Sequence, residues 1–439
     1  MQIDQMEFMI KLKSIIIWIM LLLIVSCSQA IPLTGKTELA PSISLSQRAS
    51  FTITPSITSS SSPTITPILV TPTPVNTKTP TPSSTPRMQL EINCTKKSSV
   101  LPKNAKISGL AVMHSWIYAG DPAYIWNIET DNKIKLPQNN NEQFLGFAVS
   151  TDGKWLAYEK SRKDQSIDTK QLIITGNDGT PIKVTTLLIK DFIYGWLDQN
   201  HLLINKHGEL HNTLILWNPF SGERQEFYAG DYPNIYDFYP GPGWDPINTL
   251  PLAFDPTLSR LVYSAVLDEG WGIILWDVQA RSQLLFLLVN ESQSWPRWSP
   301  DGSQVLIKKP VNVSKSYSTY ATNDELYSIS RDGAVTRLTY LTDYYHNVDI
   351  GPYSWSPDMR YIAFWQNGFF ALLDLISHKV TNYCISFTNL FAPIWSMDSK
   401  QVVLWTIDGN EQIILIDVKD NYVVKIAEDT AARGWMVSP

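Results

Sequence analysis

The sequence has few of the residues that usually carry chemistry. Its 439 residues include three cysteines and six histidines. The net charge is −6 and no long basic run occurs, so the electrostatic footprint of a nucleic-acid-binding protein is missing. No Gly-x-Ser-x-Gly elbow occurs, nor the Ser-x-Asp-x-Gly-x-Thr-Trp pattern of sialidases. We therefore expect no cofactor and no nucleic-acid partner, and we favour a non-enzymatic role, with an enzyme as the alternative.

A metal site is not predicted either. The nearest approach is His207-Gly208-Glu209-Leu210-His211, but a zinc-protease helix needs His-Glu-x-x-His, so the glutamate is misplaced. The segment also falls in a predicted hairpin, where residues four apart need not converge. The other histidines show no ligand spacing and are His114, His201, His346 and His378.

Long hydrophobic runs are also scarce. The uncharged run Ile15–Val25 follows Lys11 and Lys13 and is 11 residues long, whereas a membrane-spanning helix needs about 20. It is typical of a signal peptide. Its end, Leu23-Ile24-Val25-Ser26-Cys27, resembles a bacterial lipobox. The resemblance implies removal of residues 1–26, lipid and palmitate on Cys27, and an exported, membrane-anchored protein at the cell surface or facing the periplasm. The alternative is an ordinary signal peptide with a chance cysteine.

Residues 27–90 form a predicted linker. From Pro41 to Arg87, 31 of 47 residues are Ser, Thr or Pro. Such a chain cannot bury enough apolar surface to fold, and its Thr-Pro runs favour polyproline II. We expect a disordered, semi-rigid stalk between the lipid and the rest of the chain.

Residues 91–439 contain a repeat. Trp298-Ser299-Pro300-Asp301-Gly302 precedes an apolar strand, and related segments centre on Asp358 and Asp398, with weaker ones at Asp152, Asp198 and Asp255. The aspartates are spaced by 46, 57, 46, 57 and 40 residues. This period, with short apolar strands, predicts a β-propeller. Each aspartate is expected to form its own turn, between the first and second strands of a blade.

The repeat resembles those of TolB-like propellers, which share their architecture with WD-repeat proteins. The resemblance is good near residues 298, 355 and 395 and poor near 198 and 255. It implies an all-β ring that binds proteins or serves as an accessory domain. Such repeats also occur in peptidases of the prolyl-oligopeptidase type, but no hydrolase-sized segment accompanies them here.

We predict seven blades, one of them split. Six begin at the repeats, near 144–190, 192–228, 250–290, 294–341, 353–387 and 392–428. Residues 107–136 lack only a first strand, and the C-terminal Gly434–Pro439 resembles one. Pairing the two would close the ring and remove an open edge. Six or eight blades remain possible.

The irregular insertions all belong to connections that emerge at one face, where we place binding. Aromatic side chains on these loops suit protein interfaces or sugar stacking, although they could instead plug the ring mouth as a small satellite core. The candidates are Tyr228, Tyr232, Tyr236, Phe238, Tyr239, Trp244, Tyr317, Tyr320, Tyr344, Tyr345 and His346.

Two functions follow. The first is a non-enzymatic scaffold or receptor for another envelope protein. The second is a carbohydrate-binding or carbohydrate-active propeller, a lyase or hydrolase, whose acids would come from Asp231, Asp237, Asp343, His346 and Asp349.

Cys94 and Cys384 remain once Cys27 is lipidated. In an exported protein they could form a disulfide. It would fasten the segment before the ring to the outer edge of blade 6. Two buried free thiols are the alternative.

Overall fold

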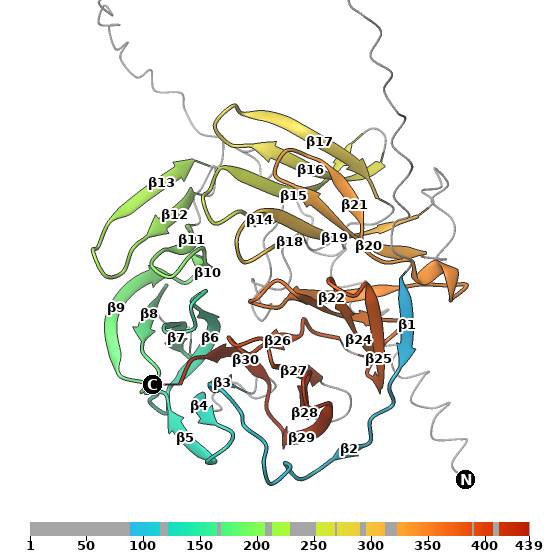
Figure 1. The fold of residues 1–439 in the computed structure, drawn as a ribbon. Coiled ribbons are helices and arrows are strands. Elements are labelled where there is room, and N and C mark those ends of the chain that lie inside the picture. Colours follow the sequence, from blue (N-terminus) through green and yellow to red (C-terminus); the bar gives the residue numbers. More distant parts are fainter. Residues whose placement is uncertain are drawn as a thin grey trace, which may run out of the picture. The chain divides into compact units, whose positions relative to one another are not determined.

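The computed structural model describes residues 88–114, 122–164, 168–206, 213–228, 252–267, 270–289, 296–311, 323–388, 390–406 and 412–438. The chain divides into two units, Met1–Thr79 and Pro80–Pro439, and all described residues belong to the second. This unit is a seven-bladed β-propeller, as predicted (Figure 1). Blades are numbered here in chain order.

Within each blade the strands follow one another outward from the ring centre (Figure 1). Blade 1 contains β30 (Ala432–Met436), β3 (Leu110–Met113), β4 (Tyr124–Asn127) and β5 (Asn132–Lys135). Blade 2 contains β6 (Glu142–Val149), β7 (Leu156–Arg162), β8 (Thr169–Thr175) and β9 (Pro181–Leu188). Blade 3 contains β10 (Phe192–Trp196), β11 (Leu202–Lys206), β12 (Thr213–Trp217) and β13 (Arg224–Tyr228). Blade 4 contains β14 (Leu252–Phe254), β15 (Arg260–Leu267), β16 (Gly270–Asp277) and β17 (Ser282–Leu288).

Blade 5 contains β18 (Arg297–Trp298), β19 (Gln304–Pro310), β20 (Asp324–Ser330) and β21 (Val335–Arg337). The 3-10 helix η3 (Leu341–Asp343) follows it. Blade 6 contains β22 (Ile350–Trp355), β23 (Tyr361–Gln366), β24 (Phe369–Asp374), β25 (Lys379–Ser386) and β1 (Gln89–Ile92). Blade 7 contains β26 (Ile394–Trp395), β27 (Gln401–Thr406), β28 (Gln412–Asp417), β29 (Tyr422–Glu428) and β2 (Lys97–Ser98). Among the described residues, no helix is long and apolar enough to cross a membrane.

The predicted split blade is confirmed. Strand β30 pairs antiparallel with β3, with Met436 opposite Leu110 and Trp435 opposite Ala111. The C-terminal strand is therefore the innermost strand of a blade whose other strands come from the N-terminal side. Hydrogen bonds between distant parts of the chain close the ring and leave no open blade edge at the centre.

The Trp-Ser-x-Asp repeat has a defined hydrogen-bonding role. Ser299 Oγ donates to Asp301 Oδ1 at 2.6 Å and accepts from the N–H of Gln304 at 3.2 Å, while Asp301 also accepts from the N–H of Ser303. Equivalent bonds join Ser150 to Asp152, Ser356 to Asp358 and Ser396 to Asp398. The serine and aspartate together satisfy the turn backbone, so these aspartates are turn residues, as expected.

Asp255 differs from this pattern. Asp255 stands at the position that serine has in the other turns: its N–H donates to the carbonyl of Arg260, and its carboxylate accepts from the N–H of Arg260. Thr257 takes the place of the aspartate and donates to the buried Asp255 carboxylate. Arg331 of blade 5 also donates to it, at 2.8 Å. The expectation that each aspartate serves only its own turn is incomplete here, because Asp255 also joins two blades.

The repeat tryptophans connect neighbouring blades. The indole N–H of Trp298 donates to the carbonyl of Ala253 in the preceding blade at 3.0 Å. Trp196 and Trp355 make the same bond, to Ala148 and Arg297. Seven apolar clusters fill the described core, mostly between adjacent blades.

Replacing Trp298 by phenylalanine should therefore lower the free energy of unfolding by about 1 kcal/mol more than the loss of buried apolar area explains, because the partly buried Ala253 carbonyl loses its donor. Trp395→Phe is the matched control, since the buried Trp395 indole N–H has no partner among the described residues. Urea unfolding followed by circular dichroism would compare the two variants. Equal losses would contradict a role for the inter-blade hydrogen bond.

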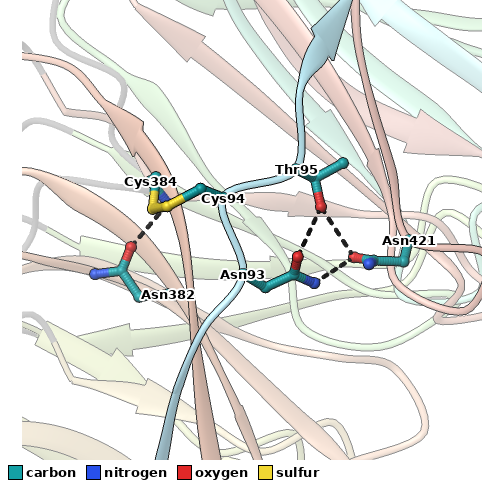
Figure 2. The surroundings of a disulfide bond; sticks show 6 residues. All are labelled: Asn93, Cys94, Thr95, Asn382, Cys384 and Asn421. Carbon is teal, nitrogen blue, oxygen red and sulfur yellow. Dashed lines mark hydrogen bonds between the residues drawn. A yellow bond between two sulfur atoms is a disulfide. The ribbon is translucent and has the colours of Figure 1, made fainter.

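The segment before the ring adds two strands that the sequence did not reveal. Strand β1 pairs parallel with β25 and β2 pairs parallel with β29, so blades 6 and 7 have five strands (Figure 1). A disulfide joins Cys94 to Cys384 between these two pairings, beside a bond from Asn93 to Asn421 (Figure 2). Met88 is buried against blade 6. We call residues 88–98 the clasp.

Candidate binding face

The two ends of the ring differ in how their connections are built. At the turn end, the connections between first and second strands are the short Ser-x-Asp turns. At the loop end lie the connections between second and third strands, and those between blades. The best described of these is 338–349, between blades 5 and 6, which contains η3. The loop end is therefore the candidate binding face.

Three of the predicted binding residues lie in connection 338–349. The hydroxyl of Tyr344 donates to the carbonyl of Met88 in the clasp at 2.8 Å, although the side chain is 42% exposed. Tyr345 packs against the core cluster between blades 5 and 6. His346 is exposed. For Tyr344 and Tyr345 the structure thus gives internal contacts, in keeping with the satellite-core alternative.

The other predicted binding residues cannot be placed. The backbone of Tyr228 ends β13, but its side chain lies outside the described residues. The remaining candidates lie outside the described residues altogether: Tyr232, Tyr236, Phe238, Tyr239, Trp244, Tyr317 and Tyr320. The same holds for His207, Glu209, His211, Asp231 and Asp237.

The connection 338–349 is held by one buried carboxylate. Glu325, at the start of β20, is fully buried and accepts from the N–H groups of Leu341 and Thr342 at 3.0 and 2.9 Å. It also accepts from the hydroxyls of Thr339 and Thr342 and from Arg337 at 2.7 Å. A single side chain therefore fixes the path from β21 through η3.

The loop end of blade 5 carries another charged group. Lys308 Nζ lies 3.6 Å from Asp324 Oδ2 and 3.9 Å from Asp349 Oδ1. Of the two described acids considered for an enzyme, Asp349 lies beside the largely buried Lys308, whereas its own side chain is 64% exposed. Asp343 is exposed in η3. Among the described residues no group of His, Cys, Asp and Glu side chains is arranged to hold a metal ion.

Blade 2 contains buried ion pairs that sequence reasoning missed. Lys170 Nζ lies 2.8 Å from Glu159 Oε2, and Glu159 Oε1 accepts from the N–H of Ile193 in blade 3. Burial raises the pKa of Glu159, against the opposing effect of Lys170. Lys160 pairs with Glu142 at 2.9 Å. Their sequence signal is the charged residues within β7 and β8, but the sequence does not show that these side chains are buried.

His114, at the end of β3, faces blade 2 between the rings of Phe144 and Phe147, with centroids at 5.5 and 5.2 Å. Burial, together with the nearby positive charge of Arg433, lowers the pKa of His114 to about 3. The ring is therefore neutral in the folded protein at physiological pH. In the unfolded chain it would protonate below its ordinary pKa of about 6.5.

Stability should consequently fall on acidification. The depressed pKa of His114 contributes stability that is present above pH 6.5 and is lost as the pH falls. Between pH 6.5 and 5 we expect a loss of about 2 kcal/mol from this group. The measurement is the difference in urea midpoint between wild type and His114→Phe at each pH. Both proteins contain Glu159, so its opposite pH dependence cancels in this difference. A difference that does not change with pH would contradict the assignment.

Comparison with known proteins gives the fold alone. No family model and no curated protein matches the chain. TolB from Acinetobacter baumannii superposes with a TM-score of 0.39 and 13% identity over 79% of this chain and 97% of that chain. The β-propeller domain of Cps50 (Swd1) from Myceliophteria thermophila gives 0.42 and 10% over 73% and 97%. The tricorn protease gives 0.42 and 11% over 70% and 34%. At these identities the similarity concerns the propeller architecture and says nothing of ligand or activity.

Proposed function

We propose that this protein is a cell-envelope lipoprotein, anchored through lipid on Cys27, whose propeller binds another protein as a non-enzymatic scaffold or receptor. The observation that supports this most is the position of the clasp. It attaches the N-terminal side of the ring to the outer edges of blades 6 and 7, by two parallel strand pairings and a disulfide. This attachment lies at the rim and reaches connection 338–349 through the Tyr344 hydroxyl, while His346 of that connection stays exposed for a partner.

The charged side chains of the described loop end support binding over catalysis. Glu325 is surrounded by its five donors, Glu159 is paired with Lys170, and Glu142 with Lys160. These groups are occupied in holding strands and connections together. A binding surface needs only exposed side chains such as His346 and the aromatic loops predicted around it.

Site-specific photocrosslinking in intact bacterial cells tests the face. A photoreactive amino acid at His346, on the loop end, should capture a single stoichiometric envelope protein. The matched control is the same group at Ile376, which is exposed in a turn of blade 6 at the opposite end. Capture from both positions, or from Ile376 alone, would reject the loop end. Replacing Tyr232, Tyr236 and Tyr239 together by alanine should abolish capture without unfolding the ring.

The anchor is tested separately. Cells fed an alkyne fatty acid should label the wild-type protein, and Cys27→Ser should lose both the label and the membrane association. Labelling that persists in Cys27→Ser would rule out this lipidation site. Retention on a glycan array without any captured protein would instead favour the carbohydrate alternative, with Asp231, Asp343 and His346 as the next residues to test.

A further inference from the structure

The outer edges of the blades are not equivalent. Blades 6 and 7 end in β25 and β29, which are covered by β1 and β2. In the part of the chain that the structure describes, no further strand pairs with the outer strands of blades 1 to 5 (Figure 1). Among these, β9 is the longest at eight residues, against four, five, seven and three in β5, β13, β17 and β21. An uncovered edge presents unpaired backbone N–H and C=O groups that can pair with another strand.

Strand β9 also exposes an apolar stripe. Val184 and Leu188 are 52 and 47% exposed and share one face of the strand, because they are four residues apart. Ile182 is 49% exposed and lies where the register of β9 with β8 shifts. Val184 lies opposite Ile173, which packs against blade 1. The stripe is left uncovered because the outer strands of blade 1, β4 and β5, have only four residues each. On β17, by contrast, Leu284 is the exposed large side chain.

The opposite face of β9 carries positive charge. Lys183 alternates with the stripe, and Lys190 follows the strand; both are exposed and neither is ion-paired with a described carboxylate. The segment from Pro181 to Lys190 contains no acid. The nearest acids along the chain, Asp178 and Asp191, accept the backbone N–H groups of Thr180 and Leu188.

We propose that the outer edge of β9 is a strand-addition site for an extended segment of a partner protein in which apolar and acidic side chains alternate. An added strand would place its apolar side chains beside the stripe and its carboxylates beside Lys183. Its backbone would pair with the edge before Leu188, whose N–H is already donated to Asp191. The molecule already uses this mode at β25 and β29, where the clasp is the added strand. The inference rests on the proposed protein-binding function but puts a contact on the rim, away from the loop end.

The probe is an eight-residue capped peptide of alternating valine and glutamate, with a valine–lysine peptide of the same length as control. Binding to the mature lipoprotein in detergent is followed by fluorescence anisotropy, and the site by hydrogen exchange. We expect the glutamate peptide to bind at least tenfold more tightly than the lysine peptide and to protect the amides of β9.

Two variants test the recognition. Val184→Asp should weaken binding at least tenfold, whereas Val335→Asp, at a similarly exposed valine on the edge strand β21, should leave it unchanged. Lys183→Glu should reverse the preference between the two peptides. Equal binding of both peptides, or no protection of β9, would overturn the proposal. So would a concentration-dependent dimer that protects β9, because the occupant would then be a second copy. If the peptide does not bind β9 but crosslinking from His346 still captures a partner, the proposed protein-binding function stands and only the β9 site is rejected. If crosslinking from His346 also captures nothing, both proposals are rejected.

Discussion

Replacing Glu325 by glutamine should lower the free energy of unfolding by about 3–5 kcal/mol, a large part of the stability of an ordinary domain. The side chain is fully buried and accepts five hydrogen bonds, from Arg337, Thr339, Leu341 and Thr342. Glutamine has almost the same shape, but its amide NH₂ group replaces one carboxylate oxygen and cannot accept a hydrogen bond. At least two buried N–H or O–H groups would lose their acceptor, and Arg337 would lose its counter-charge.

The control is Glu428→Gln, which removes the carboxylate of an exposed pair with Lys425. Exposed pairs contribute little, so we expect a change below about 1 kcal/mol. Urea unfolding compares the two variants, and hydrogen exchange should show faster exchange in 338–349 for Glu325→Gln alone. If Glu325→Gln fails to fold, Thr342→Ala removes one of the five bonds and should cost about 1 kcal/mol. Equal effects of Glu325→Gln and Glu428→Gln would show that the carboxylate does not organise this connection.

The architecture was predictable because its signal is local and repeated. Each Trp-Ser-x-Asp segment ends one strand and begins the next, so seven blades and the split blade could be counted without knowing any distant contact. The hydroxyl-to-carboxylate bond of Ser299 and Asp301 explains why the motif keeps both residues. The motif misplaced Asp255, because the aspartate stands where the other turns have serine and Thr257 stands where they have aspartate.

What the sequence did not predict depends on contacts between distant segments. Strand β1 has four residues and β2 has two, and each gains its strand character by pairing with an edge more than 280 residues away. The sequence predicted Glu325 only as the start of a strand. Its buried role could not be predicted, because its hydrogen-bond donors lie in the connection that follows β21. The internal contacts of Tyr344 and Tyr345 could not be told from the sequence, because aromatic loop residues look the same whether they line an interface or a satellite core.

Reduction of the disulfide should release the clasp while the ring stays closed. The closure of blade 1 depends on β30 and β3, and neither contacts the cysteines. The clasp is held otherwise by two short parallel pairings, by the burial of Met88 and by the Tyr344 hydroxyl. Short pairings of this kind open locally at low free-energy cost. Hydrogen exchange of residues 88–98 should therefore accelerate at least tenfold after reduction, with little change in β3 and β30.

The disulfide should also contribute to global stability. It links residues 290 positions apart, so it restrains much of the unfolded chain, and its loss should cost about 3–5 kcal/mol. The experiment compares wild type with Cys94→Ser/Cys384→Ser in urea. Tyr344→Phe in the oxidised protein is the matched control, because it removes one clasp contact and leaves the covalent link; we expect about 1 kcal/mol. If the double variant unfolds at the wild-type midpoint but exchanges rapidly at 88–98, the clasp is a local latch. If both measurements are unchanged, the clasp is held by its strand pairings and the disulfide is dispensable.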